Sequence, residues 1–117
     1  MKTLPKNEMM NAVGMKLEPS DWIEISQQRI NEFADCTEDH QFIHIDEAKA
    51  KNTTFGGTIA HGFLTLSLLA KFSEDIGITP EDTVMGMNYG FDKVRFLAPV
   101  SAPFPPGRHR GAGKAGG

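Results

Sequence analysis

The sequence is poor in several residue types that mark particular protein classes. It has a single cysteine, Cys36, in 117 residues, which excludes an intrachain disulfide framework and is typical of a protein of the reducing cytoplasm. No apolar run approaches the roughly 20 residues of a membrane-spanning helix. Residues 1–15 lack the apolar core of a signal peptide. These absences predict one soluble, cytoplasmic domain with no membrane association.

Charge is slightly negative and unevenly distributed. Twelve Lys and Arg stand against fifteen Asp and Glu, a net charge of −3, and no basic cluster suits a nucleic-acid backbone. All the acidic residues lie before residue 101. Residues 101–117 are rich in Gly, Pro and Arg and have one large apolar side chain, so too little apolar surface can be buried to offset the entropy of ordering. We therefore expect a domain over residues 1–100 and a disordered tail over 101–117.

Local patterns predict several short elements in the first half of the chain. Alternating Ile23 and Ile25 favour a strand over 21–25. Ser26 is a suitable N-cap for a helix over 27–36, whose apolar residues recur at helical spacing. Asp46 is a second N-cap, for a short helix over 47–51. Residues 37–46 lack helical periodicity and are expected to form a loop.

The second half predicts a long buried helix followed by strands. Residues 59–76 are apolar around nearly the whole helix circumference, which is typical of a buried helix, and Gly77 ends the segment. Residues 83–98 alternate in a strand-like manner. A buried helix beside strands requires a sheet wrapped around it, and the sequence supplies few strands. We therefore expect the domain to be incomplete, with its C-terminal strands missing.

Ionisable side chains crowd residues 39–46, where they alternate with apolar ones. Asp39 and His44 lie five positions apart across a non-helical turn and can converge on one water molecule, as general acid–base catalysis near pH 7 requires. Two other interpretations stay open. One is a solvated loop in which Asp46 only caps a helix; the other is a metal site of His40 and His44 with Asp39 or Asp46.

A second candidate element is Ala60-His61-Gly62, at the start of the predicted long helix. Backbone N–H groups in the first turn of a helix have no intrahelical acceptor, so an oxyanion could bind the Gly62 N–H. A tight turn explains the motif equally well. His61 is interpreted as a packed, hydrogen-bonded histidine, and Cys36 as a core residue rather than a nucleophile.

Three motifs in this order carry a resemblance to a known family. They are ADCTEDHQFIHID, FGGTIAHGFLTLSLL and MNYGFDKVRFLAPV, which together span about residues 20–100. In them the chain resembles the MaoC-like (R)-specific enoyl-CoA hydratases, and most of all their nodulation-protein-N-like branch. The resemblance implies an α+β hot-dog fold, with a curved antiparallel sheet around a long central helix at about 59–76, and a homodimer.

The resemblance also implies a reaction and the residues that perform it. The family's catalytic aspartate and histidine correspond to Asp39 and His44, although Gln41-Phe42 replaces the family's Asn-Pro pair. Its oxyanion donor corresponds to the Gly62 N–H. The implied reaction is reversible hydration of a trans-2-enoyl-CoA thioester to an (R)-3-hydroxyacyl-CoA thioester, with no metal and no cofactor.

Two other functions remain open at this point. A hot-dog thioesterase usually has a carboxylate on its central helix, and no Asp or Glu occurs between Ile59 and Glu74, which argues against one. A non-catalytic fragment that binds acyl thioesters is the other alternative. Because the family continues with further strands where this chain has its Gly/Pro/Arg tail, we expect the 117-residue chain to be poorly stable, aggregation-prone or dependent on a partner.

Overall fold

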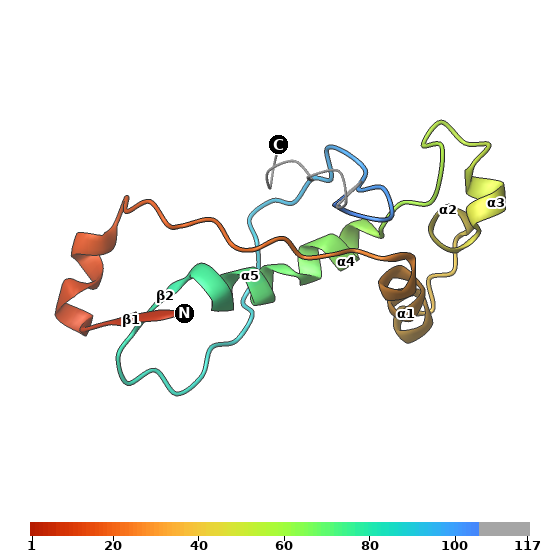
Figure 1. Ribbon diagram of the computed structural model, residues 1–117. Coiled ribbons are helices and arrows are strands. Elements are labelled where there is room, and N and C mark those ends of the chain that lie inside the picture. Colours follow the sequence, from red (N-terminus) through yellow and green to blue (C-terminus); the bar gives the residue numbers. More distant parts are fainter. Residues whose placement is uncertain (106–117) are drawn as a thin grey trace. The chain divides into compact units, whose positions relative to one another are not determined.

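The computed structural model describes residues 1–105 of the chain. Helices and strands follow one another in the order shown in Figure 1. They are β1 (Lys2–Leu4), the 3-10 helix η1 (Lys6–Ala12), α1 (Gln27–Thr37), α2 (Phe42–Ile45), α3 (Glu47–Ala50), α4 (Gly62–Ser67), α5 (Leu69–Ile76) and β2 (Ile78–Pro80). The chain therefore has the predicted α+β character, with helices predominating.

The chain divides into two compact units, each built from two separate stretches of sequence. Unit 1 comprises residues 1–20 and 68–95, and unit 2 comprises residues 21–67 with the described residues from 96 onward. The sequence pattern predicts one domain over 1–100. The division between the units falls between Ser67 and Leu68, inside the segment predicted as one long helix.

The predicted single buried helix over 59–76 is wrong for the described chain. Helices α4 and α5 are separate, interrupted at Leu68. The Ser67 hydroxyl donates a hydrogen bond to the Phe63 carbonyl at 2.6 Å, a side-chain bond that competes with the helical ladder and often bends helices. Leu64 is the buried residue of α4, and α5 has none. The helix end at Gly77 is confirmed.

Unit 1 holds the one sheet among the described residues. Strands β1 and β2 pair in parallel, with Lys2 opposite Ile78 and Leu4 opposite Pro80. The described residues contain no antiparallel sheet, and 83–98 form no paired strand. Several large apolar side chains of that segment are exposed, Val84 and Met87 among them.

Unit 2 contains most of the buried side chains. The Ser26 hydroxyl accepts from the Arg29 N–H at 3.1 Å and begins α1, which confirms the predicted cap and buries Ile30 and Ala34. Asp46 accepts from the Lys49 N–H at 2.9 Å and begins α3, as predicted. The buried apolar residues of the unit are Ile25, Ile30, Ala34, Ala50, Ile59, Ala60 and Leu64.

Residues 100–104 pair with two earlier parts of unit 2. Ile59 and Ser101 form an antiparallel bridge, as do Ile25 and Phe104. Residues 21–25, predicted as a strand, therefore contribute one isolated bridge. Backbone pairing also continues past residue 100, where the sequence pattern places the start of the tail. The rest of that predicted tail, from residue 106 onward, lies outside the described residues.

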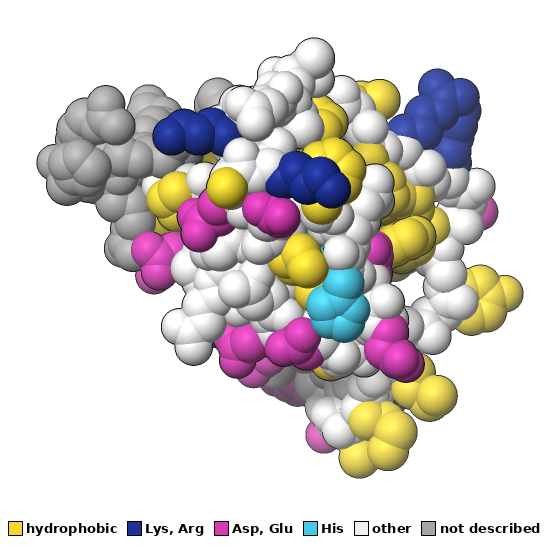
Figure 2. Space-filling view, turned by 90° about the vertical axis from the view of Figure 1, so that its right-hand side faces the viewer, with side chains coloured by type: hydrophobic (Ala, Val, Ile, Leu, Met, Phe, Trp, Pro, Cys, Tyr) yellow, Lys and Arg dark blue, Asp and Glu magenta, His cyan; other side chains and the backbone are white. Residues whose placement is uncertain are grey.

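The surface carries apolar side chains among charged ones. On the face drawn in Figure 2, apolar side chains reach the surface at several places, and Lys and Arg are scattered. No helix within residues 1–105 combines the length and the apolar character needed to cross a bilayer.

The contact between Phe104 and Trp22 allows a test of whether residues 101–104 belong to the folded body. Their rings meet edge to face at a centroid distance of 5.8 Å. We expect Phe104→Ala to lower the free energy of unfolding by about 1–2 kcal/mol, since a fully buried Phe costs about 3–5 kcal/mol and this one is half-buried. Urea unfolding followed by fluorescence of Trp22, the one tryptophan, measures the change. The matched control is Val84→Ala, at a side chain 92% exposed, and equal stability of both variants would contradict the prediction.

Candidate active site

His44 is buried and anchored through its backbone and its ring. It lies in α2, a single helical turn within the segment expected to be a loop. Its ring Nδ1 lies 2.8 Å from the Ile59 carbonyl oxygen, and its own carbonyl accepts from the Gln27 side chain at 2.7 Å. Since a carbonyl oxygen only accepts, Nδ1 carries the hydrogen and Nε2 of the neutral ring bears the free lone pair. His44 is therefore held with a proton acceptor available at Nε2.

Asp39 lies in the turn that follows α1. Glu38, the C-cap of α1, adopts the left-handed conformation with φ of 63° and turns the chain out of the helix. The Asp39 side chain is exposed, and its Oδ1 lies 3.4 Å from the Gln41 N–H. The carboxylate is thus open to water and free of any ion pair among the described residues.

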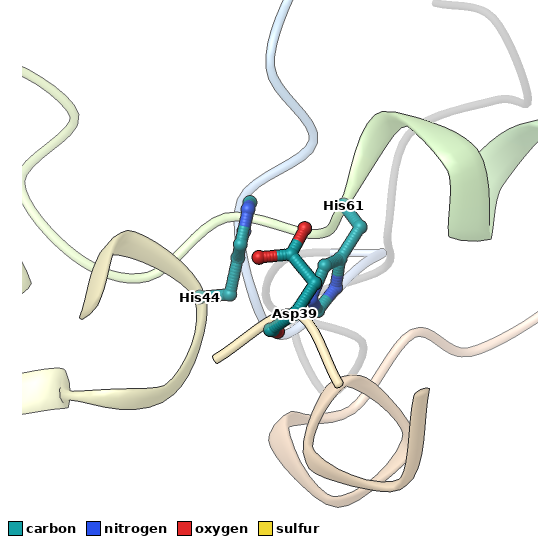
Figure 3. A group of neighbouring side chains, drawn as sticks. All are labelled: Asp39, His44 and His61. Atoms are coloured by element: carbon teal, nitrogen blue, oxygen red, sulfur yellow. The ribbon is translucent and has the colours of Figure 1, made fainter. Parts of the chain in front are cut away.

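A third side chain, His61, joins Asp39 and His44. One potential ligand atom from each of the three lies within 4.8 Å of the others, and Figure 3 shows the side chains converging from the turn after α1, from α2 and from the residue before α4. The His61 ring stacks on the His44 ring with a centroid distance of 3.9 Å. The packed, hydrogen-bonded character expected of His61 agrees with its burial. Its closeness to Asp39 and His44 is not encoded in any local pattern.

The hydrogen bonding of His61 leaves one of its ring nitrogens without a partner. Nε2 lies 3.0 Å from the Asp39 backbone carbonyl and therefore carries the hydrogen. Nδ1 is buried and has no hydrogen-bond partner among the described residues. A buried acceptor left unpaired costs about 1–3 kcal/mol. The site thus brings together an exposed carboxylate and two buried imidazole rings, and each ring has one nitrogen held by a backbone carbonyl.

The metal site considered from the sequence is not assembled. His40 contacts the Asp35 carboxylate at 3.0 Å, and Asp46 caps α3. Asp39, His44 and His61 form an alternative set of ligands. However, the two rings stack with an interplanar angle of 23°. A metal about 2.0–2.1 Å from both nitrogens would have to lie in both ring planes, and stacked planes do not meet close to the rings. This geometry disfavours a metal ion.

Gly62 borders the same cavity as His44. The cavity has a volume of about 310 Å³. Its lining includes His44, Phe55, Ile59, Gly62, Phe96 and Val100. A Cβ added to Gly62 would lie 3.0 Å from three ring atoms of Phe96, so only glycine leaves that ring its present position. The Gly62 N–H has no backbone acceptor among the described residues.

Cys36 lies outside the site. The expectation that Cys36 is a core residue is wrong, because its side chain is exposed. Its Sγ donates to the Phe33 carbonyl at 3.5 Å. The thiol therefore has no place in the chemistry of the cluster.

Comparison with known proteins identifies what the chain is similar to. Residues 8–104 match the family model described as MaoC like domain. The chain is 48% identical over 101 residues to nodulation protein N of Rhizobium meliloti, a match covering 86% of this chain and 63% of that protein. It is 46% identical over 93 residues to 3-hydroxyacyl-thioester dehydratase Z of Mycobacterium tuberculosis, covering 80% and 61%. The chain thus spans a little under two thirds of the length of these relatives.

Proposed function

The chain belongs to the MaoC-like domain family, and on that premise we propose that it catalyses (R)-specific hydration of trans-2-enoyl-CoA and the reverse dehydration of 3-hydroxyacyl-CoA. The mycobacterial relative is named for the dehydration direction of this chemistry. The observation that carries the proposal is the convergence of the Asp39 carboxylate and the His44 ring, with His44 and Gly62 bordering one cavity.

Asp39 and His44 act together on the attacking water. The water donates its hydrogens to the Asp39 carboxylate and to His44 Nε2, the ring nitrogen that its hydrogen bond to Ile59 leaves bare. The water oxygen forms a bond to C3, the pair of electrons of the C2–C3 double bond moves toward the thioester, and the dyad takes the proton from the water. The same dyad then delivers a proton to C2. Neither a metal nor a redox cofactor takes part.

The Gly62 N–H stabilises the charge that develops during this step. As the water adds, negative charge grows on the thioester oxygen, and a positioned backbone donor lowers the energy of that state more than that of the substrate. Phe55, Ile59 and Val100 line the cavity beside Gly62 and supply apolar walls for an acyl chain. The Phe96 ring, close against Gly62, must move to admit the thioester.

The proposal includes the architecture and setting that the family resemblance implies. In it, the protein has a hot-dog fold with a curved antiparallel sheet and pairs as a homodimer in the cytoplasm. Exposed apolar side chains on α4 and α5, such as Phe63 at 66%, support this proposal, because a second subunit could cover them.

The first test removes each member of the dyad in turn. We expect Asp39→Asn and His44→Ala to lower kcat/KM for hydration of crotonyl-CoA by about 100- to 10,000-fold, because each removes a group that transfers or holds the proton. Loss of the enoyl-thioester absorbance measures hydration. The matched control is His40→Ala, in the same segment but paired with Asp35 at the surface, which we expect to remain within about 2-fold of the parent, as surface changes away from a site do.

Other outcomes of this assay identify the alternatives. Release of free thiol would indicate a thioesterase, and no reaction with the unaltered chain would indicate a non-catalytic protein that binds acyl thioesters. Full activity in Asp39→Asn would contradict the dyad.

The second test concerns the oxyanion donor. Gly62→Ala keeps the N–H but places a methyl group against Phe96. Because that methyl group would keep the thioester oxygen away from the N–H, we expect kcat/KM to fall about 100- to 1,000-fold, the range for a lost oxyanion-hole donor. Gly57→Ala is the matched control, because a Cβ there meets nothing within 4 Å.

The double variant Gly62→Ala/Phe96→Ala separates two causes of that loss. If the methyl group blocks the thioester oxygen, removal of the Phe96 ring leaves the activity low. Recovery of full activity would attribute the loss to the displaced ring and contradict the idea that the methyl group blocks the Gly62 N–H.

A further inference from the structure

His61 contacts both residues of the proposed dyad. Its side chain is almost fully buried, at 2% exposure, and it precedes Gly62 in the chain. Its Nε2 donates to the Asp39 carbonyl at 3.0 Å, and its ring stacks on His44 at 3.9 Å. One side chain therefore connects the loop that carries the carboxylate, the ring that carries the base and the start of α4.

The hydrogen bond to Asp39 matters because little else holds that residue. Within residues 1–105, the hydrogen bonds recorded for Asp39 are the one from His61 and the 3.4 Å contact of its Oδ1 with the neighbouring Gln41 N–H. The Asp39 side chain is exposed, so packing does not restrain it. Among the described residues, the bond from His61 is thus the one hydrogen bond that joins Asp39 to a residue outside its own loop.

A packing role alone does not explain a histidine at this position. Phe33 lies on one side of the ring, with a centroid distance of 4.9 Å, and His44 stacks on it as well. An apolar ring would fill such a space without leaving a buried nitrogen, Nδ1, unpaired. The distinctive contribution of the imidazole is its donor at Nε2, which reaches the Asp39 main chain.

We propose that His61 is a positioning residue of the hydration site, and this inference rests on the proposed function. By donating to the Asp39 carbonyl, His61 holds the carboxylate close to the His44 ring so that both accept hydrogens from the same water. Because His61 directly precedes Gly62 in the chain, the same residue also limits the distance between Asp39 and the Gly62 N–H. The chemical steps remain those of Asp39 and His44, and His61 acts through them.

A matched pair of amide variants tests the hydrogen bond. In His61→Gln the amide nitrogen takes the place of Nε2 and can still donate to the Asp39 carbonyl, whereas in His61→Asn it takes the place of Nδ1 and falls short. We expect His61→Asn to lower kcat about 100-fold with KM changed less than about 3-fold, since a misplaced catalytic group costs rate rather than binding. His61→Gln is expected to stay within about 5-fold of the parent kcat, because the positioning bond is kept.

A second measurement reports the mobility of the loop around Asp39 independently of activity. NMR relaxation of the Asp39 and Gln41 amides should show added fast motion in His61→Asn and parent-like order in His61→Gln. Thermal unfolding of both variants checks that each is folded. Equal kcat losses in the two variants, or an ordered loop and parent kcat in His61→Asn, would overturn the inference.

The two readouts also separate this inference from the proposed function. If the unaltered chain hydrates crotonyl-CoA but His61→Asn leaves the loop ordered, the positioning role fails and the proposed function stands. If the unaltered chain is inactive, the proposed function fails and the inference about a hydration site fails with it. Added motion specific to His61→Asn would then show only that the bond orders the loop.

Discussion

The site depends on the main chain of Ile59. The Ile59 N–H donates to the Ile43 carbonyl at 3.0 Å, and the Ile59 carbonyl accepts from His44 Nδ1 at 2.8 Å. These two bonds attach α2 to the segment before α4 and also determine which nitrogen of His44 is bare. Buried backbone groups must find hydrogen-bond partners. The bond that pairs the Ile59 carbonyl also fixes the orientation of the His44 ring. His61 and Gly62 follow within three residues, so their distance from His44 is limited by the same attachment.

The segment over 58–60 is held on its other side by residues beyond 99. The Ala60 N–H donates to the Val100 carbonyl at 2.8 Å, and the Ala102 N–H donates to the Thr58 carbonyl at 3.0 Å. The cavity between His44, Gly62 and Phe96 therefore has one wall made of chain distant in sequence. This arrangement links fold and site, because loosening residues 100–104 would release the segment on which the orientation of His44 depends.

Sequence patterns predicted what local chemistry determines. Both N-caps, Ser26 and Asp46, were predictable because a cap is a contact between near neighbours. The closeness of His61 to His44 was not, because it results from stacking across 17 residues of chain. The interruption at Leu68 was missed because apolar periodicity does not register the bond that the Ser67 hydroxyl donates within the helix. Pairing at 101–104 was missed because composition reports on side chains, whereas these contacts are made by the backbone.

The central claim is that Asp39, His44 and Gly62 act on one bound thioester. A crystal structure of the chain with (R)-3-hydroxybutyryl-CoA, the hydration product, tests this claim most directly. The account predicts the 3-hydroxyl within about 2.6–3.2 Å of both the Asp39 carboxylate and His44 Nε2, with the thioester oxygen on the Gly62 N–H. A product bound with its hydroxyl away from both side chains, or with its thioester oxygen on another donor, would contradict it.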